Sequence, residues 1–264
     1  MNILLINLPE SVDRLNFQKK QLKQLGLDFE VLVATSRNEL SQEEIQNLSY
    51  GWERPLRSSE LACFMSHKNA WLKVQESQEP TLILEDDALL SIHTPALLNT
   101  LSQSTNRDLI TLEVRGRKKV VAKQAQSINT DFNQYRLYQD RTGAAGYILW
   151  PSGAKKLLNK ASNFPPALAD AFISSCYTLN AYQVEPAAII QLDQCDNYQV
   201  PSQYSTTSHI SSQRKPQPKL PPFSYTLFKL RRIKAQLKMG VRQLWLRRVS
   251  QRRAINLIRS QFIS

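Results

Sequence analysis

The sequence predicts an α/β fold, and the N-terminal segment carries the first evidence. An apolar run over residues 2–8 precedes a segment, 12–25, in which apolar residues recur at helical spacing; a second apolar run follows at 29–34. Gly26 ends the helical segment, as glycine commonly does at helix C-termini. The order strand, helix, strand is a βαβ signature, and it predicts parallel pairing within one sheet.

A second observation supports the same class. The apolar run over 81–84 has β-branched residues at Thr81 and Ile83, reads as a buried strand, and ends abruptly in Glu85, Asp86 and Asp87. Open α/β sheets bind ligands at the carboxyl ends of their strands, so this is where functional polar residues are expected.

The remaining elements continue the alternation, although residues 116–140 carry no clear period. In order, we expect a short helix at 43–48, a helix capped by Ser58 or Ser59, strands at 109–114 and 144–150, helices at 151–158 and 169–179, and a strand at 187–192. With 264 residues and 42% hydrophobic content, the chain suits one domain with an appendage.

Cysteine usage and hydropathy suggest a compartment. The three cysteines (Cys63, Cys176 and Cys195) contain no CxxC pair, which predicts reduced thiols with neither a disulfide framework nor a zinc site. The apolar run near the N-terminus is too short for a signal peptide, and no stretch approaches the roughly 20 apolar residues of a membrane span. We therefore expect a cytoplasmic protein.

The charge is distributed unevenly along the chain. Of 34 Lys and Arg residues, 14 follow Asp196, whereas all 22 Asp and Glu residues lie at or before it. This predicts a nearly neutral globular body over 1–212, a Pro-rich linker over 213–224 and a basic amphipathic helical tail over 225–264. Such asymmetry points to an anionic partner for the tail.

The acidic triplet is the sharpest chemical feature. Three consecutive carboxylates repel one another, and burying them without a counter-charge is costly. A hard divalent cation would neutralise them and leave coordination positions free for diphosphate oxygens. The alternative is a solvated acidic turn.

Other polar residues have both functional and ordinary interpretations. Arg14 follows the first strand closely, so it is either a phosphate ligand or a surface arginine. His67 is a base, a ligand or a polar residue at the rim of a cleft; it lies about 20° from Glu60 around the predicted helix. Asp170 begins a helix, where a carboxylate is common without any catalytic role.

Four segments together resemble the bacterial lipopolysaccharide glycosyltransferases of family 25. They are INLPESVDR with the following βαβ unit, SSELACFMSHKNAW, LILEDDALL and TGAAGYILWPSGAKKLL, and the resemblance spans residues 3–210. Each motif is weak alone, but four in the right order are specific. Ser59 and Ala62 replace two glycines of the family pattern, which puts close backbone approach to the donor there in doubt.

The resemblance implies a GT-A fold, a Rossmann-like sheet with an acidic metal motif at its edge. It also implies a UDP-sugar donor, commonly UDP-galactose, inversion at the anomeric carbon, and Mn²⁺ or Mg²⁺ as cofactor. On this basis Asp87 and Glu85 are the expected metal ligands and Asp170 the catalytic base. The residues expected to bind the nucleotide sugar are Asn7, Arg14, Glu60, Ser66, His67, Glu85 and Asp86. His209 has no assigned role.

The tail and the body leave alternatives open. A basic helix with an apolar stripe suits the anionic inner face of the cytoplasmic membrane, where a lipid-linked glycan acceptor would be found. It could instead pack on the body or mediate self-association. For the whole protein, the alternatives are a catalytically inactive scaffold and a nucleic-acid-binding protein that uses the tail; we expect no nucleic-acid partner, because the body has no recognition motif.

Overall fold

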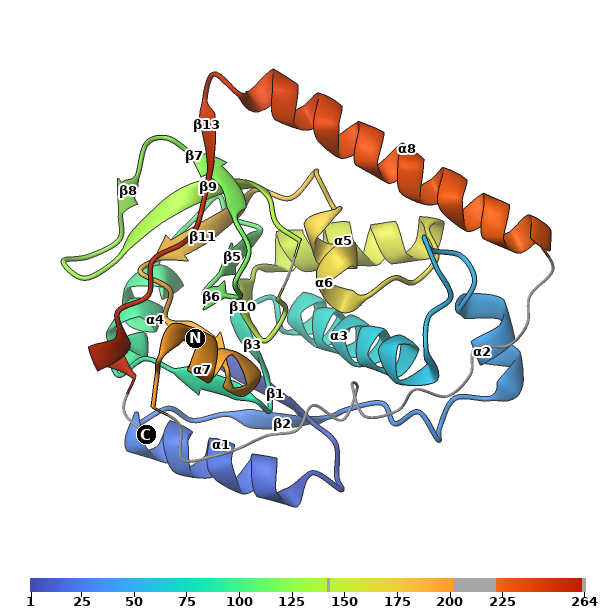
Figure 1. Cartoon of the computed structure of the whole chain (residues 1–264). Coiled ribbons are helices and arrows are strands. Elements are labelled where there is room, and N and C mark those ends of the chain that lie inside the picture. Colours follow the sequence, from blue (N-terminus) through green and yellow to red (C-terminus); the bar gives the residue numbers. More distant parts are fainter. Residues whose placement is uncertain (142, 202–221, 263–264) are drawn as a thin grey trace.

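The computed structural model describes residues 1–141, 143–201 and 222–262. Its main sheet has the strand order β13-β7-β9-β11-β5-β10-β3-β1-β2, with β8 paired to β9 (Figure 1). These strands are β1 (Asn2–Asn7), β2 (Glu30–Val33), β3 (Thr81–Glu85), β5 (Leu109–Thr111), β7 (Lys119–Ala122), β8 (Gln126–Ser127), β9 (Asn133–Gln139), β10 (Gly146–Leu149), β11 (Ala181–Glu185) and β13 (Ser250–Arg253). A small sheet has the order β4 (Ala88–Leu90), β12 (Ile189–Gln191) and β6 (Glu113–Val114).

The helices lie on both sides of the main sheet. They are α1 (Val12–Gln24), α2 (Gln42–Leu48), α3 (Ser58–Ser77), α4 (Thr94–Ser102), α5 (Pro151–Asn163), α6 (Ala169–Ser174), α7 (Cys195–Tyr198) and α8 (Pro222–Leu246), with 3-10 turns at Leu192–Gln194 and Arg259–Gln261. Figure 1 shows α3, α5 and α6 grouped together, and α8 along the outer edge of the molecule.

The strand β1 lies inside the sheet and contributes to two cores. It pairs in parallel with both β2 and β3, which confirms the predicted parallel unit and the α/β, Rossmann-like class. Leu4 and Ile6 pack in the core beneath α3, α5 and α6. Ile3 and Leu5 pack in the other core, with α1 and α4. Side chains alternate across a strand, so a continuous apolar run such as this one suits a strand covered on both faces.

The C-terminal segment departs from the predicted helix. The helical pattern holds through Leu246, but Ser250–Arg253 forms β13, an edge strand antiparallel to β7. The Arg253 guanidinium pairs with the buried Glu185 carboxylate, which also accepts the Asn256 backbone N–H at 2.7 Å. Pairing with an exposed strand edge therefore overrides the apolar spacing; Ile255 and Phe262, which fitted a helical stripe, are buried in two small cores instead.

Smaller departures concern helix ends and unassigned strands. Arg57, rather than Ser58 or Ser59, stands at the N-cap of α3, and its backbone N–H donates to Glu60. The helix α6 ends at Ser174, earlier than predicted. The strands β7, β8 and β9 occupy the stretch without a clear period, and β11 was also missed.

The buried carboxylate of Asp108 connects the main sheet to the helix α5. Asp108 precedes β5 and accepts hydrogen bonds from the Ser152 hydroxyl at 2.6 Å, the Lys156 ammonium at 2.5 Å and the Asn180 backbone N–H at 2.6 Å. It thus links β5, α5 and the start of β11. Burial by itself would raise the pKa of Asp108, but the bonds from Asn180 and Lys156 outweigh it and lower that pKa.

We expect Asp108→Ala to reduce the free energy of unfolding by about 2 kcal/mol at neutral pH, because it leaves three donors without their acceptor. A lowered folded-state pKa gives stability that is present above the unfolded value, near 4, and is lost as the pH falls through the folded value. The difference in the free energy of unfolding between the variant and wild type, measured with urea, should therefore become smaller below about pH 4. The exposed Asp28→Ala serves as control; an equal loss for both variants would contradict this role.

Candidate active site

The acidic triplet lies at the carboxyl end of β3, beside the carboxyl end of the parallel strand β1. Asp86 faces β1 and α1: it accepts hydrogen bonds from the Asn7 amide at 2.9 Å and the Arg14 guanidinium at 2.8 Å. Gln18 of α1 donates to the Asp86 backbone oxygen. Asp86 is therefore the member of the triplet that is held by the scaffold, and Asn7 and Arg14 reach the sheet edge as predicted.

Glu85 and Asp87 share a partner on the neighbouring small sheet. The Gln191 amide at the end of β12 donates to Glu85 at 3.2 Å and lies 3.5 Å from Asp87. Burial, together with the charges of Glu85 and Asp86, raises the pKa of Asp87 to about 7. Among the described residues, the cation nearest to Asp87 is Arg14, at 3.9 Å, and that guanidinium is already bonded to Asp86. Asp87 is thus a carboxylate short of positive charge.

This environment fits a divalent cation. Glu85 and Asp87 offer carboxylate oxygens and Gln191 an amide, and Asp193 adds further negative charge while paired with Arg115. Oxygen ligands of this kind suit Mn²⁺ or Mg²⁺. A bound cation would supply the counter-charge that the buried carboxylate Asp87 lacks.

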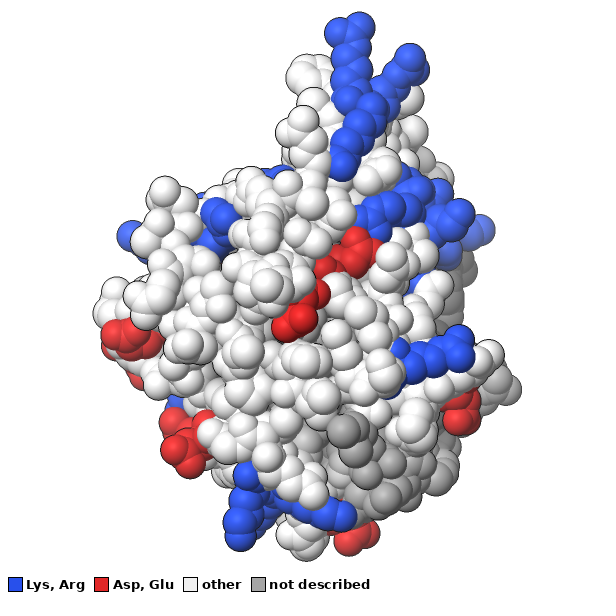
Figure 2. Space-filling model, turned by 90° about the vertical axis from the view of Figure 1, so that its left-hand side faces the viewer, with Lys and Arg blue, Asp and Glu red and all other residues white. Residues whose placement is uncertain are grey.

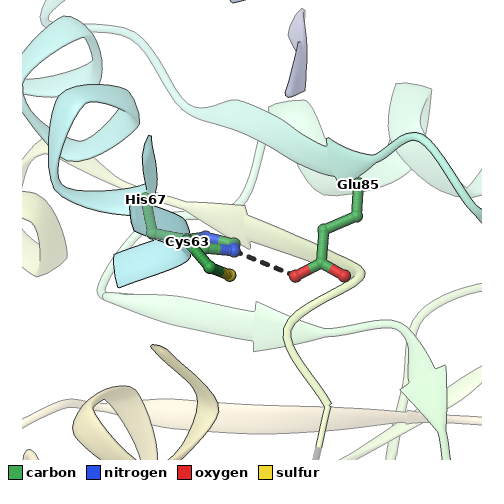
Figure 3. Close-up of side chains that lie close together, drawn as sticks. All are labelled: Cys63, His67 and Glu85. Carbon is green, nitrogen blue, oxygen red and sulfur yellow. Dashed lines mark hydrogen bonds and ion pairs between the residues drawn. The ribbon is translucent and has the colours of Figure 1, made fainter. Parts of the chain in front are cut away.

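A chain of hydrogen bonds positions Glu85 from the core. The Trp71 ring N–H donates to the Tyr147 hydroxyl at 2.9 Å, and that hydroxyl lies 3.0 Å from His67 Nδ1. Tyr147 accepts from Trp71, so its own proton is free to donate to Nδ1, which puts the proton of a neutral imidazole on Nε2. Nε2 lies 3.0 Å from the Glu85 carboxylate (Figure 3). Although burial opposes it, this bond from His67 lowers the pKa of Glu85.

Cys63 lies beside this pair, one helical turn before His67 on α3 (Figure 3). The ligand atoms of Cys63, His67 and Glu85 lie within 4.8 Å of one another, so these three side chains could also hold a metal ion. This grouping was not predicted, since the cysteine count alone argued against zinc. Burial and the nearby carboxylates, Glu85 first, raise the pKa of the Cys63 thiol, and a metal on Nε2 would displace the bond from His67 to Glu85.

A cavity of about 330 Å³ opens in front of these groups. It lies between the ends of β1 and β3, the segment after β2 and the start of α3, and six predicted residues line it: Arg14, Ser66, His67, Glu85, Asp86 and Asp87. Asn7 supports its wall through Asp86. Ser66 links α3 to the segment after β2, because its hydroxyl accepts the Thr35 N–H at 2.9 Å. The cavity has the dimensions of an ordinary ligand site.

Besides Asn7, two predicted residues do not line this cavity. Glu60 is buried, holds the Arg54 guanidinium through two 2.8 Å bonds and caps α3. Asp170 begins α6 and lines a second cavity, together with Tyr147, Tyr177 and Arg242. Burial raises the pKa of Asp170, and the charge of Glu85 acts in the same direction. Among the described residues, Glu85 lines the first cavity but not the second. His209 lies outside the described residues.

Sequence reasoning missed several residues around the triplet. Gln191 lies 3.5 Å from Asp87, Arg115 pairs with Asp193, and the buried Glu113 accepts the Ala145 N–H at 2.8 Å. Burial, reinforced by Glu85, raises the pKa of Glu113 to about 8. A signal did exist for Gln191, since it lies next to the end of a predicted strand, as Glu85 does. No such signal marks Arg115, which follows the two-residue strand β6.

Comparison with known proteins identifies the family of the chain. Residues 1–173, well over half of the chain, match the model of glycosyltransferase family 25 (LPS biosynthesis protein). The chain therefore belongs to this family, and the predicted GT-A arrangement of a Rossmann-like sheet with an acidic motif at its edge is present.

The relatives include animal proteins. Procollagen galactosyltransferase 1-B of Xenopus laevis is 28% identical over 222 residues, covering 70% of this chain and 34% of the relative. Procollagen galactosyltransferase 2 of Homo sapiens is 25% identical over 196 residues, covering 66% of this chain and 30% of the relative. The chain thus spans about a third of the length of these relatives.

Solved structures resemble the chain only distantly. The inositol-1-phosphate CTP transferase from T. maritima has a TM-score of 0.42 at 13% identity and covers 73% of this chain and 89% of that one. A Drosophila β-1,4-galactosyltransferase 7 mutant, solved with manganese, UDP-Gal and xylobiose, has a TM-score of 0.36 at 9% identity and covers 83% and 81%. These scores are too low to carry an argument about the site.

We expect Asp87→Asn to stabilise the metal-free protein at pH 8 by about 1 kcal/mol, or about 2–4 °C in melting temperature. A carboxyl pKa raised in the folded state penalises folding once the group is ionised, and this penalty disappears below the unfolded value, near 4. The gain should therefore shrink toward pH 5. Asp28→Asn, at an exposed carboxylate elsewhere, is the matched control and should leave the melting temperature unchanged. Thermal unfolding in EDTA measures both, and destabilisation by Asp87→Asn would contradict the charge argument.

Proposed function

We propose that this chain is an inverting, metal-dependent glycosyltransferase that transfers a hexose from a UDP-sugar to a surface-glycan acceptor. Galactose is the first candidate, because the relatives named above are galactosyltransferases. The family description favours lipopolysaccharide or lipooligosaccharide as acceptor. The observation that carries the proposal is the position of Glu85 and Asp87, two carboxylates directed to one cavity at the carboxyl end of β3.

The residues divide the work of a single displacement. The acceptor oxygen bonds to the anomeric carbon as the bond to the diphosphate breaks; the electron pair leaves with the diphosphate, and the acceptor proton passes to a carboxylate. Asp170 is the proposed proton acceptor, and its raised pKa favours that role. Arg14 would stabilise negative charge on the diphosphate. A divalent cation held by Glu85 and Asp87 would act as Lewis acid toward the same oxygens.

The supporting side chains have a different role. His67 holds Glu85 in one orientation through Nε2, and Tyr147 and Trp71 hold the ring of His67 in turn. Such support keeps a ligand carboxylate in place when substrate enters. His67 and Ser66 also line the cavity, where contact with the nucleotide sugar stays a prediction.

We place the reaction at the inner face of the cytoplasmic membrane, with the protein peripherally associated through its basic C-terminal region. Among the described residues, no helix combines the length and apolar character needed to cross a membrane. The basic residues that follow Asp196 support an anionic partner. The neutral body gives no reason to expect nucleic acid as that partner.

The first test is donor hydrolysis by the purified chain. We expect UDP release from one of UDP-galactose, UDP-glucose, UDP-N-acetylgalactosamine and UDP-N-acetylglucosamine with Mn²⁺, abolished by EDTA. Asp87→Ala should reduce it by about 100-fold or more, because it removes a group that holds the cation. Asp28→Ala, an exposed carboxylate elsewhere, should leave it unchanged. If no donor releases UDP and calorimetry detects no nucleotide binding, the alternative of a catalytically inactive scaffold is favoured.

Asp170→Asn separates the base from the donor site. It removes the proton acceptor while keeping the shape of the side chain, so transfer to a glycan acceptor should fall by about 100-fold or more. UDP binding, measured by calorimetry with Mn²⁺, should stay within about 2-fold of wild type, because Asp170 lies outside the cavity that holds the triplet. Unchanged transfer in this variant would remove Asp170 from the base role.

A further inference from the structure

The helix α8 carries its apolar side chains toward solvent. Along one face of the helix, large apolar residues are exposed in succession: Leu230 (56%), Ile233 (51%), Leu237 (64%), Val241 (54%), Leu244 (65%) and Trp245 (85%). At 100° per residue these positions fall within one stripe roughly 120° wide. An amphipathic helix of a globular protein normally turns such a stripe to its core.

The opposite face of α8 contacts the body mainly through polar groups. Arg231 donates to the Tyr50 backbone oxygen at 2.7 Å, and Gln243 donates to the Gln139 side chain at 3.1 Å. The Arg242 guanidinium lies 4.6 Å from the ring centre of Tyr177. Phe228 is the buried apolar residue among the described side chains of this helix. The helix therefore turns its polar face to the body and its apolar face to solvent, the opposite of a core helix.

A contiguous exposed apolar stripe of this kind marks an interaction surface. The charges beside it indicate the partner. Lys229 and Lys234 flank or enter the stripe, Arg248 follows in the turn after α8, and no acidic residue follows Asp196. Figure 2 shows Lys and Arg side chains gathered toward the top of the molecule, the end at which α8 meets β13. The partner must accept apolar side chains and basic side chains on the same face.

An anionic lipid surface meets both requirements. A second copy of α8 would bury the stripe but would bring two basic helices together with no acidic residue on either to pair with them. A nucleic acid would pair with the charges but leave the stripe in water. The undescribed residues 202–221 offer only Tyr204, Ile210 and Leu220 as large apolar side chains, too few to cover it.

We propose that α8 lies in the plane of an anionic membrane, with the Leu230–Trp245 stripe inserted at the boundary between headgroups and acyl chains. The basic side chains beside the stripe would contact lipid phosphates, as in other interfacial amphipathic helices. A helix of 25 residues lies along the surface for roughly 37 Å. The evidence for membrane binding comes from α8 itself and does not depend on the proposed enzymatic function.

The position of α8 also indicates how membrane binding would serve catalysis; this step rests on the proposed function. Arg242 reaches from the body-facing side of α8 into the cavity that contains Asp170 and Tyr177. The proposed base therefore lies behind the helix that contacts the lipid. A glycan attached to a lipid in the same membrane would approach Asp170 from the α8 side, while the soluble nucleotide sugar uses the larger cavity at the triplet.

Vesicle binding tests the proposal with the full chain. We expect it to float with vesicles rich in phosphatidylglycerol, to bind phosphatidylcholine vesicles weakly and to lose affinity as salt is raised. Leu237→Gln combined with Leu244→Gln should weaken binding by at least about 10-fold, since both side chains lose apolar burial. The matched control replaces two exposed apolar residues elsewhere, Ile92→Gln with Phe164→Gln, and should bind as wild type does.

Three results would overturn the proposal. One is absence of binding to anionic vesicles, and another is equal binding by the α8 variant. The third is a dimer in analytical ultracentrifugation that the α8 variant abolishes, because a second copy would then cover the stripe. Donor hydrolysis without vesicles should be the same in wild type and variant. If neither protein hydrolyses a donor, the proposed function fails while the vesicle result still decides the role of α8.

Discussion

The fold is constrained above all by the crowding of carboxylates where β3 ends. Glu85, Asp86 and Asp87 follow a buried strand, and each is stabilised from a different direction: His67 on α3, Arg14 on α1 and Gln191 on β12. These partners come from elements far apart in sequence, so the site exists only when the two sheets and both helix layers are assembled. Among the described members of this cluster, Asp87 lacks a close cation of its own, so a bound metal ion would stabilise it most.

The sequence predicted the local elements well, because local patterns determine them. The run over β1 and the helical spacing of α1 define the parallel unit, and the acidic triplet follows a buried strand as predicted. The sequence could not reveal that Asp86 faces the scaffold while Glu85 and Asp87 face Gln191. These directions depend on how β4 pairs with β12. Glu60 likewise matched a family position, but the sequence could not reveal that its carboxylate pairs with Arg54 and caps α3 through the Arg57 N–H.

Long-range pairing explains the larger miss at the C-terminus. Apolar residues spaced as in a helix also suit an extended segment that places some of them in small cores, and the sequence alone does not distinguish these cases. The edge of β7 and the Glu185 carboxylate decide the outcome. In α8 the opposite holds: the periodicity predicted a helix correctly, but only the structure reveals that its apolar stripe faces outward.

The return of the chain through β13 means that the basic region is not a detachable tail. Residues 250–262 complete the main sheet beside β7 and fill two small cores with Ile255 and Phe262. A truncation intended to remove α8 would also strip this closing strand, leaving an unpaired edge that invites intermolecular strand addition. Loss of solubility in such a deletion would then say nothing about lipid.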